Sequence, residues 1–134
     1  MSASNTAIID EFRANKGMVG GAFDGKPVLL LHHIGAKTGT RRVNPLMYRQ
    51  EGDTFYVFAT KAGADTHPDW YHNLKANPAA AIEVGTERFA VVASEIEGGE
   101  RDRIYQSHAA TFPQFADYQT GTIRTIPVFA LVPG

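Results

Sequence analysis

The chain has 134 residues, of which 13 are Lys or Arg and 14 are Asp or Glu, so its formal net charge is −1. This balance leaves no global basic field for nucleic acid or an anionic membrane. The absence of cysteine excludes a disulfide framework, a thiol nucleophile and a zinc–thiolate site. A chain of this length fits one domain, so we expect residues 1–134 to form a single unit in which residues 1–20 are an N-terminal helix and linker.

The first half of the chain is dominated by strand signals. Residues 4–14 place apolar side chains at helical spacing, and several glycines then end that pattern. Residues 27–34 are a continuous apolar run of strand length. Further strands are predicted over residues 43–49 and 54–59, and the Glu-Gly-Asp turn between them indicates an antiparallel hairpin.

The second half mixes helices with strands. Pro68 suits the first turn of a helix that ends near Ala76, and Thr66 is its expected cap. The remaining predicted elements are a hairpin of residues 79–84 and 88–94, a charged helix over 98–110 and a last strand over 125–132.

The order of these elements predicts the fold class. Strands joined by short turns, with helices inserted between them, favour an α+β fold over a doubly wound one. We therefore expect a mostly antiparallel, barrel-like sheet with flanking and inserted helices. No repeat, linker or membrane-spanning run interrupts it, and the acidic start of the chain predicts no signal peptide.

The turn after the first strand is built to hold an anion. Lys37, Arg41 and Arg42 supply charge, while Gly35 and Gly39 let backbone N–H groups approach a ligand without an intervening Cβ. Because the two arginines alternate at the start of a strand, we expect Arg42 to face the ligand. The alternative is an ordinary solvated turn, which is the commoner role of an isolated basic turn.

A second polar turn, residues 60–65, leads into the helix that carries Trp70, and the two turns suggest one shared site. Apolar groups of residues 44–46 and of the helix could wall a flat heterocycle, with Asn44 or Asn73 hydrogen-bonded to its polar edge. The charged turns would then hold an anionic tail. Trp70 has an alternative role as an ordinary core residue.

Several other chemistries are excluded or disfavoured. The chain lacks the phosphate-loop, dinucleotide and Gly-x-Ser-x-Gly motifs. Adjacent His32 and His33 on a strand point to opposite faces, and His67 and His72 are five residues apart, so neither pair has the spacing of a metal site. We expect no metal.

Three blocks of sequence resemble the deazaflavin-dependent nitroreductase family. They are Gly-x-Lys-Thr-Gly-x-x-Arg-Val-Asn-Pro-Leu at 35–46, Lys-Ala-Gly-Ala at 61–64 and Pro-x-Trp-Tyr-x-Asn-Leu-Lys-Ala-Asn-Pro at 68–78. The late blocks Asp-Tyr-Gln at 117–119 and Arg-Thr-Ile-Pro at 124–127 also resemble the family. The resemblance implies a split β-barrel that binds reduced coenzyme F420, an 8-hydroxy-5-deazaflavin with a phosphodiester and an oligoglutamate tail, and passes hydride to an acceptor.

Matched residue by residue, the resemblance implies roles for fourteen positions. Tyr118 is the implied proton donor or substrate-orienting group, and Thr60 is implied to bond the ring or the acceptor. The phosphate and tail would contact Lys37, Thr38, Arg42, Lys61, Ala62 and Gly63. The ring would be lined by Asn44, Pro45, Leu46, Ala59, Trp70 and Asn73.

The resemblance also implies partners and leaves alternatives. The implied acceptor is a quinone, with nitroaromatic compounds as adventitious substrates; Phe112 and Phe115 replace family tyrosines, which disfavours bulky nitroimidazoles. The alternatives are a non-catalytic carrier of the deazaflavin and a split barrel that binds flavin mononucleotide or haem. The protein is expected in the cytoplasm without a nucleic-acid partner, and peripheral membrane contact and oligomeric state stay open.

Overall fold

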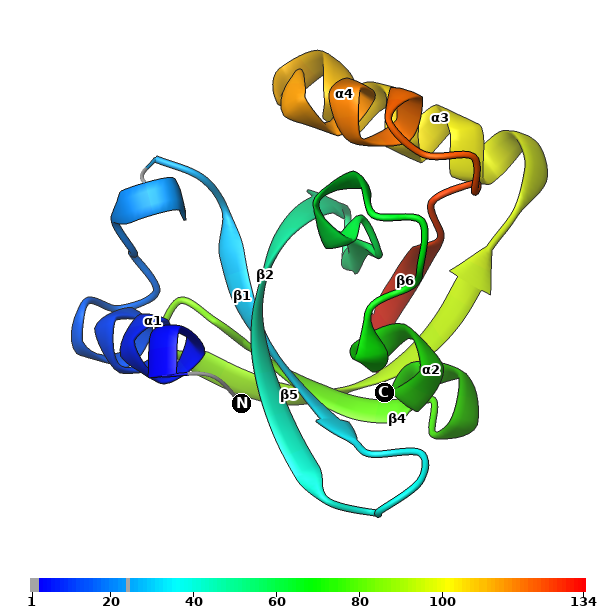
Figure 1. The fold of residues 1–134 in the computed structure, drawn as a ribbon. Helices are drawn as coiled ribbons and strands as arrows, with labels where there is room; N and C mark the ends of the chain where they lie inside the picture. The colour runs from blue at the N-terminus through cyan, green and yellow to red at the C-terminus, as the bar shows by residue number, and fades with distance from the viewer. Residues whose placement is uncertain (1–2, 24) are drawn as a thin grey trace.

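The computed structural model describes residues 3–23 and 25–134, and within these residues six antiparallel strands close into a barrel (Figure 1). The strand order is β1-β2-β3-β6-β5-β4, and β4 pairs with β1 to complete the circle. The strands are β1 (Val28–Ile34), β2 (Arg41–Glu51), β3 (Thr54–Phe58), β4 (Ala79–Val84), β5 (Glu87–Ile96) and β6 (Val128–Pro133). This confirms the predicted α+β class with a mostly antiparallel barrel.

Helices lie around this barrel at separate places. In Figure 1, α3 and α4 lie side by side above the barrel, whereas α2 lies at the opposite, lower end. The helices are α1 (Ala3–Ala14), α2 (Asp69–Ala76), α3 (Gly98–Thr111) and α4 (Gln114–Thr120), with short 3-10 turns η1 (Gly21–Phe23) and η2 (Lys61–Gly63). Within the described residues, no helix is long and apolar enough to cross a membrane.

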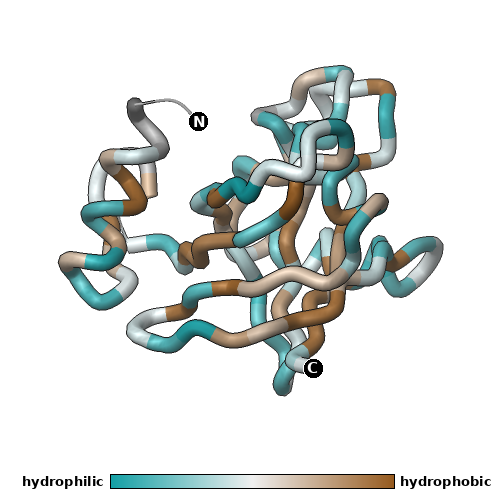
Figure 2. Tube along the Cα trace, turned by 90° about the horizontal axis from the view of Figure 1, so that it is seen from below, coloured by the Kyte–Doolittle hydropathy of each residue, from teal (hydrophilic) through white to brown (hydrophobic). Residues whose placement is uncertain are grey.

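The strands bury side chains on both faces. In β1, Leu29 and Leu31 belong to one apolar cluster with Trp70 of α2, while Val28 and Leu30 belong to a second cluster with residues of α1, α3 and α4. Successive side chains of a strand point to opposite faces, so a strand covered on both faces reads as a continuous apolar run. Figure 2 shows the resulting apolar segments along the strands.

The N-terminal helix is fastened to the barrel by apolar and charged contacts. Phe12 of α1 is almost fully buried, and Arg13 Nη2 lies 2.8 Å from Oε2 of Glu83 on β4. The same carboxylate oxygen lies 2.6 Å from Nε2 of His32. Hydrogen bonding to Arg13, with a further contribution from His32, lowers the pKa of Glu83.

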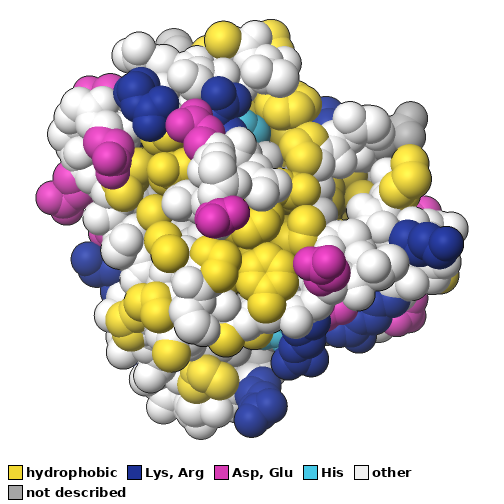
Figure 3. Space-filling model, turned by 180° about the vertical axis from the view of Figure 1, so that it is seen from behind, with side chains coloured by type: hydrophobic (Ala, Val, Ile, Leu, Met, Phe, Trp, Pro, Cys, Tyr) yellow, Lys and Arg dark blue, Asp and Glu magenta, His cyan; other side chains and the backbone are white. Residues whose placement is uncertain are grey.

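Figure 3 shows the face turned away from the viewer of Figure 1, where hydrophobic side chains gather across the middle and charged side chains surround them. Large apolar side chains are exposed at four of the described positions, namely Met18, Val92, Ile123 and Val132. Val92 and Val132 are register partners on β5 and β6, so these two exposed side chains are neighbours on adjoining strands.

Two expectations about elements were wrong, and one helix was missed. The last strand begins at Val128 and not at residue 125. The backbone of Ile126 is engaged by side chains, because Arg101 donates a hydrogen bond to the Ile126 carbonyl and the Gln119 side-chain oxygen accepts one from the Ile126 N–H. Thr66 does not cap α2; its hydroxyl accepts a hydrogen bond from Lys61 Nζ, and Pro68 occupies the N-cap. Helix α4 was not predicted at all.

Candidate functional site

The basic turn between β1 and β2 is closed by its own backbone. Gly35 N–H donates to the Thr40 carbonyl at 2.8 Å, and Gly39, with φ of 69°, donates to the Gly35 carbonyl at 2.9 Å. A Cβ on Gly35 would stand 2.8 Å from Thr38 Oγ1, so a larger residue there would force the Thr38 side chain to move. The side chains of Lys37 and Thr38 are exposed beside it.

A cavity of about 330 Å³, here called the turn cavity, lies between this turn and α2. It is lined on the turn side by residues 35–38 and on the helix side by Asp69, His72 and Asn73, with Arg42 between them. Cations and a glycine-bounded turn are the groups that bind phosphate or carboxylate in proteins.

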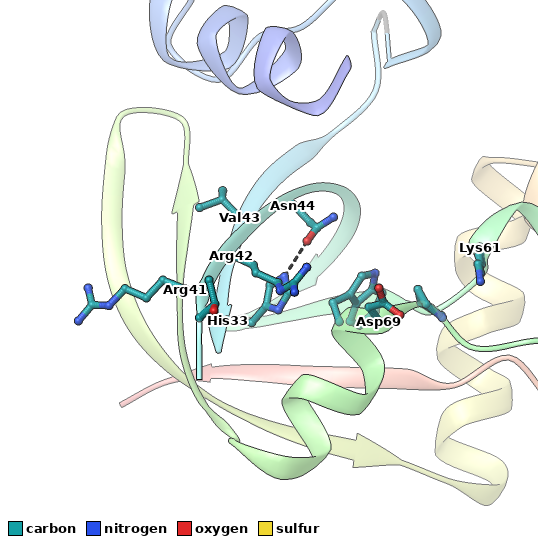
Figure 4. A pocket seen from close by; sticks show the side chains of 10 residues that line it. His33, Arg41, Arg42, Val43, Asn44, Lys61 and Asp69 are labelled. Atoms are coloured by element: carbon teal, nitrogen blue, oxygen red, sulfur yellow. Dashed lines mark hydrogen bonds between the residues drawn. The ribbon is translucent and has the colours of Figure 1, made fainter. Parts of the chain in front are cut away.

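A larger cavity of about 560 Å³, the central cavity, shares Arg42 and Asp69 with the turn cavity (Figure 4). Asn44 of β2, Lys61 of η2 and Trp70 of α2 also line it. Figure 4 shows Arg41 extending away from the group while Arg42 lies beside His33. The two cavities therefore adjoin at Arg42, as a ligand with a ring and an anionic tail would need.

A third cavity of about 260 Å³, the α4 cavity, lies where the middle of β2 faces helix α4. Its walls are mostly apolar, and its polar side chains are Thr60, Gln114 and Tyr118. Gln114 Nε2 lies 3.5 Å from the Tyr118 hydroxyl, to which it donates. The full lining is Phe23, Pro45, Leu46, Met47, Phe58, Thr60, Gln114, Phe115 and Tyr118.

A buried histidine links the basic turn to the central cavity. His33 is 2% exposed, its Nε2 lies 2.6 Å from Asn44 Oδ1, and its Nδ1 lies 3.0 Å from Asn73 Nδ2. Asn73 Oδ1 in turn accepts the backbone N–H of Ala36 at 2.8 Å. Burial lowers the pKa of His33, and Arg42 and His32 lower it further, against the hydrogen bond to Asn44.

The structure distributes the residues singled out from the sequence over these three cavities. The turn cavity is lined by Lys37, Thr38 and Asn73, and the central cavity by Asn44, Lys61 and Trp70. The α4 cavity is lined by Pro45, Leu46, Thr60 and Tyr118. Arg42 lines the first two. Trp70 is also a core residue, 5% exposed with its ring 6.1 Å from that of Phe129.

Three of the expected residues have other surroundings. Ala59 is fully buried, and its carbonyl accepts a hydrogen bond from Arg124. Gly63, with φ of 82°, packs so closely on α4 that an added Cβ would lie 3.2 Å from the Tyr118 carbonyl oxygen. The side chain of Ala62 lies outside the described residues.

The sequence reasoning missed the anchor of the second turn, Arg124. Its guanidinium donates to the carbonyls of Ala59, Thr60 and Ala64 at 2.9, 2.6 and 2.7 Å, and it lies 3.0 Å from Nδ1 of His67. Burial lowers the pKa of Arg124. The sequence signal that could have identified Arg124 was its place in the family block Arg-Thr-Ile-Pro. Its contacts with the turn around η2 depend on the tertiary fold.

The histidines do not assemble a metal centre within the described chain. His67 precedes α2, so it does not share a helix with His72, and the centroids of the two rings lie 6.0 Å apart. Among the residues that the structure describes, no group of three or more His, Cys, Asp or Glu side chains could hold a metal ion.

Residues 6–133 match the family described as F420H(2)-dependent quinone reductase. The chain belongs to this family. An F420H(2)-dependent quinone reductase of Mycobacterium tuberculosis is 40% identical over 124 residues, which cover 90% of this chain and 83% of the relative. The deazaflavin coenzyme implied by the resemblance is thereby confirmed, and the family description names the quinone that was expected as the acceptor. The nitroreductase label of the resemblance is not confirmed.

Solved structures of similar sequence share the fold. An F420-H2-dependent reductase, FDR-A, is 39% identical with a TM-score of 0.72, covering 78% of this chain and 93% of its own. A second solved chain, described as a domain-swapped dimer, is 36% identical with a TM-score of 0.74 and covers 96% and 94%. The residues present fit the coenzyme, because the turn cavity offers cations to an anionic tail and the central cavity offers a ring site.

Proposed function

We propose that the chain transfers a hydride from reduced coenzyme F420 to a quinone. The observation that carries the proposal is the continuity of the turn and central cavities through Arg42 and Asp69. An elongated ligand with a flat ring at one end and phosphodiester and carboxylates at the other needs this arrangement. The α4 cavity, built from the next residues of β2, supplies a separate apolar place for the acceptor.

The coenzyme would be held chiefly by charge and by flat apolar walls. Lys37 and Arg42 provide charge-assisted hydrogen bonds for the phosphodiester and tail, with Thr38 beside them. Trp70 lines the central cavity, where the ring would lie, and Asn44 offers the ring a hydrogen bond. Lys61 reaches the central cavity from η2, where its Nζ donates to Thr66.

When bound, the reduced deazaflavin supplies a hydride from C5 and does not readily carry out one-electron chemistry. The chain's contribution is to position the acceptor and supply a proton, because a quinone that accepts a hydride still needs one proton to become a hydroquinone. We assign this proton to the Tyr118 hydroxyl. Gln114 donates to its oxygen, which leaves the hydroxyl hydrogen for the acceptor.

The same cavity leads us to propose nitroaromatic compounds as additional acceptors, because they are flat, conjugated and polar at one edge. Quinones partition into lipid, so we also propose peripheral contact with membranes. The apolar side chains of Met18 and Ile123 are 75% and 97% exposed and available for it. Sedimentation with and without phospholipid vesicles tests this contact and measures the oligomeric state.

The function is tested by titrating the protein with F420 and with flavin mononucleotide while Trp70 fluorescence is recorded, followed by menadione-dependent oxidation of reduced F420. Selective F420 binding with turnover supports the reductase. Binding without turnover of menadione or a nitroaromatic favours a carrier, and preferential binding of flavin mononucleotide overturns the assignment. Tyr118→Phe is expected to lower kcat about 100-fold with little change in F420 affinity.

The tail assignment has its own test. Lys37→Ala and Arg42→Ala are each expected to weaken F420 binding about tenfold or more and to flatten its salt dependence, because each removes a charge pair. Arg88→Ala is the matched control, since Arg88 is an exposed arginine on β5 that lines none of the three cavities. If all three variants bind alike, the tail does not lie at this turn.

A further inference from the structure

A chain of hydrogen bonds runs from the backbone of the basic turn to the wall of the central cavity. It passes from Ala36 N–H to Asn73 Oδ1 at 2.8 Å, from Asn73 Nδ2 to His33 Nδ1 at 3.0 Å, and from His33 Nε2 to Asn44 Oδ1 at 2.6 Å. Its members come from the turn, α2, β1 and β2. Figure 4 shows the last of these bonds, between His33 and Asn44.

The direction of every bond in this chain is fixed at its first member. A backbone N–H can only donate, so the atom of Asn73 that faces Ala36 is the acceptor oxygen, and the amide nitrogen must face His33. That nitrogen is a donor, so His33 Nδ1 must be the unprotonated ring nitrogen. His33 Nε2 therefore carries the proton and donates it to Asn44 Oδ1.

The last member of the chain faces the central cavity. With its oxygen engaged by His33, Asn44 has only its amide nitrogen left, and that nitrogen has no partner within the described chain. If Asn44 were turned over, two donors would meet at His33. The wall of the cavity consequently offers an N–H donor and not a carbonyl acceptor.

We infer that His33 is a positioning residue that transmits the orientation set by Ala36 N–H, through Asn73, to Asn44, so that Asn44 presents an N–H donor to the ring of the coenzyme. The inference rests on the proposed function for the identity of that ring. A ring carbonyl or imine nitrogen can accept a hydrogen bond from this N–H, whereas a ring N–H cannot.

The same chain couples the two cavities. Asn73 holds the turn that would bind the tail, and Asn44 lines the ring site, so one neutral imidazole keeps both in place. A proton on Nδ1 would oppose the Asn73 amide, and the chain would have to break. The groups whose charge acts on His33 are Arg42 on β2, His32 on β1 and Asp69 on α2, while Glu83 of β4 is engaged by His32. Arg41 of β2 and Arg88 of β5 line a further pocket together with His33.

The first arm of the test does not depend on the coenzyme. Long-range ¹H–¹⁵N NMR of the coenzyme-free protein is expected to show the His33 ring as the neutral tautomer protonated at Nε2 at neutral pH. A ring protonated at Nδ1, or at both nitrogens, would overturn the inference. This measurement tests the His33 tautomer even if F420 does not bind. Failure to bind F420 would contradict the proposed function but not the orientation of the hydrogen-bond chain.

The second arm compares three variants by F420 titration over a range of pH. His33→Leu is expected to weaken binding about tenfold. The wild type is expected to lose affinity at acid pH, where a proton on His33 Nδ1 breaks the chain. His33→Gln, whose amide can accept from Asn73 and donate to Asn44, is expected to bind within about threefold of the wild type at neutral pH and to show no such acid loss. His32→Gln, the neighbour bonded to Glu83, is the control and should bind like the wild type. Wild-type affinity in His33→Leu, or an unchanged acid loss in His33→Gln, would contradict the inference.

Discussion

Arg124 is a single side chain on which the whole second turn depends. Its guanidinium satisfies the carbonyls of Ala59, Thr60 and Ala64, which are buried or half-buried. Removing it takes this donor from the carbonyls of Ala59 and Ala64, while the Thr60 carbonyl keeps the Gly63 N–H at 2.9 Å. Each buried acceptor left unpaired costs about 1–3 kcal/mol. We expect Arg124→Ala to lower the free energy of unfolding by about 3 kcal/mol or more, measured by urea denaturation.

Arg124→Lys is the informative companion to this variant. An ammonium group cannot reach several carbonyls with the geometry of a planar guanidinium, so it should recover only part of the lost stability although the charge is kept. A lysine variant as stable as the wild type would mean that charge, and not the fork of donors, holds the turn.

His108 of α3 is a buried residue that the proposed chemistry does not use. It is 1% exposed, stacks on Phe58 at 4.2 Å, and neither ring nitrogen has a hydrogen-bond partner among the described residues. Burial lowers its pKa to about 4, against about 6.5 in an unfolded chain. Between pH 6.5 and pH 4, His108 is protonated in the unfolded chain but stays neutral in the folded one. The free energy of unfolding therefore decreases as pH falls through this range.

His108→Phe is expected to remove that acid sensitivity. The difference in unfolding free energy between the variant and the wild type should be constant above pH 6.5 and grow by up to about 3 kcal/mol toward pH 4. Urea denaturation at several pH values measures it. Parallel pH profiles for the two proteins would show that His108 is protonated in the folded state or has a partner there.

The candidate site could be predicted from the sequence where the signal is local. Lys37 and Arg42 could be assigned to an anion site because a glycine-bounded turn after a strand confines them to one place. The role of Asn73 could not be predicted from the sequence, because its hydrogen bonds to Ala36 and His33 depend on how α2 docks on β1. The burial of Ala59 likewise depends on a distant residue, Arg124.

At the level of elements, the closest approach near the site is between η2 and α4. Gly63 has a φ of 82°, and an added Cβ would lie 3.2 Å and 3.3 Å from backbone atoms of Tyr118. Gly63→Ala is therefore expected both to strain the turn and to push α4 away, lowering stability by about 2 kcal/mol and raising KM for menadione. Thermal denaturation and steady-state kinetics measure these effects.

Gly52 in the β2–β3 turn offers a matched control for backbone strain alone. Its φ is 60°, but an added Cβ would meet nothing within 4 Å. Gly52→Ala should cost about 1 kcal/mol and leave the kinetics unchanged. If the two variants behave alike, the contact between η2 and α4 does not set the position of Tyr118.

The elements that the sequence predicted well are those whose signal lies within a few residues. The hairpin of β2 and β3 and that of β4 and β5 follow from short polar turns between apolar runs, and both form. Helix α4 carries too few apolar residues for a helical period to stand out, and it is held by tertiary contacts such as the bond from the Tyr105 hydroxyl to the Phe115 carbonyl at 2.6 Å. The late start of β6 has the same cause, because Arg101 competes for Ile126.

For the molecule as a whole, the single-domain expectation can be tested by unfolding. Trp70 is the lone tryptophan and belongs to the cluster of Leu29 and Leu31, whereas α1, α3 and α4 pack on the other cluster. Both clusters share the strands between them, so we expect one cooperative transition. Trp70 fluorescence and far-UV circular dichroism should then give coincident thermal unfolding curves; loss of helical signal before the fluorescence change would show that the helical layer unfolds separately.

The closed strand order also governs how the protein is made. Strand β6 pairs with both β3 and β5, so it forms two seams of the barrel at once, and it follows every other strand in the chain. A ribosome delivers the earlier strands first, as hairpins with open edges that can pair with other chains. The barrel can close only after residue 133 has been synthesised, so the last of the six strands to be made completes the circle around which the cavities are arranged.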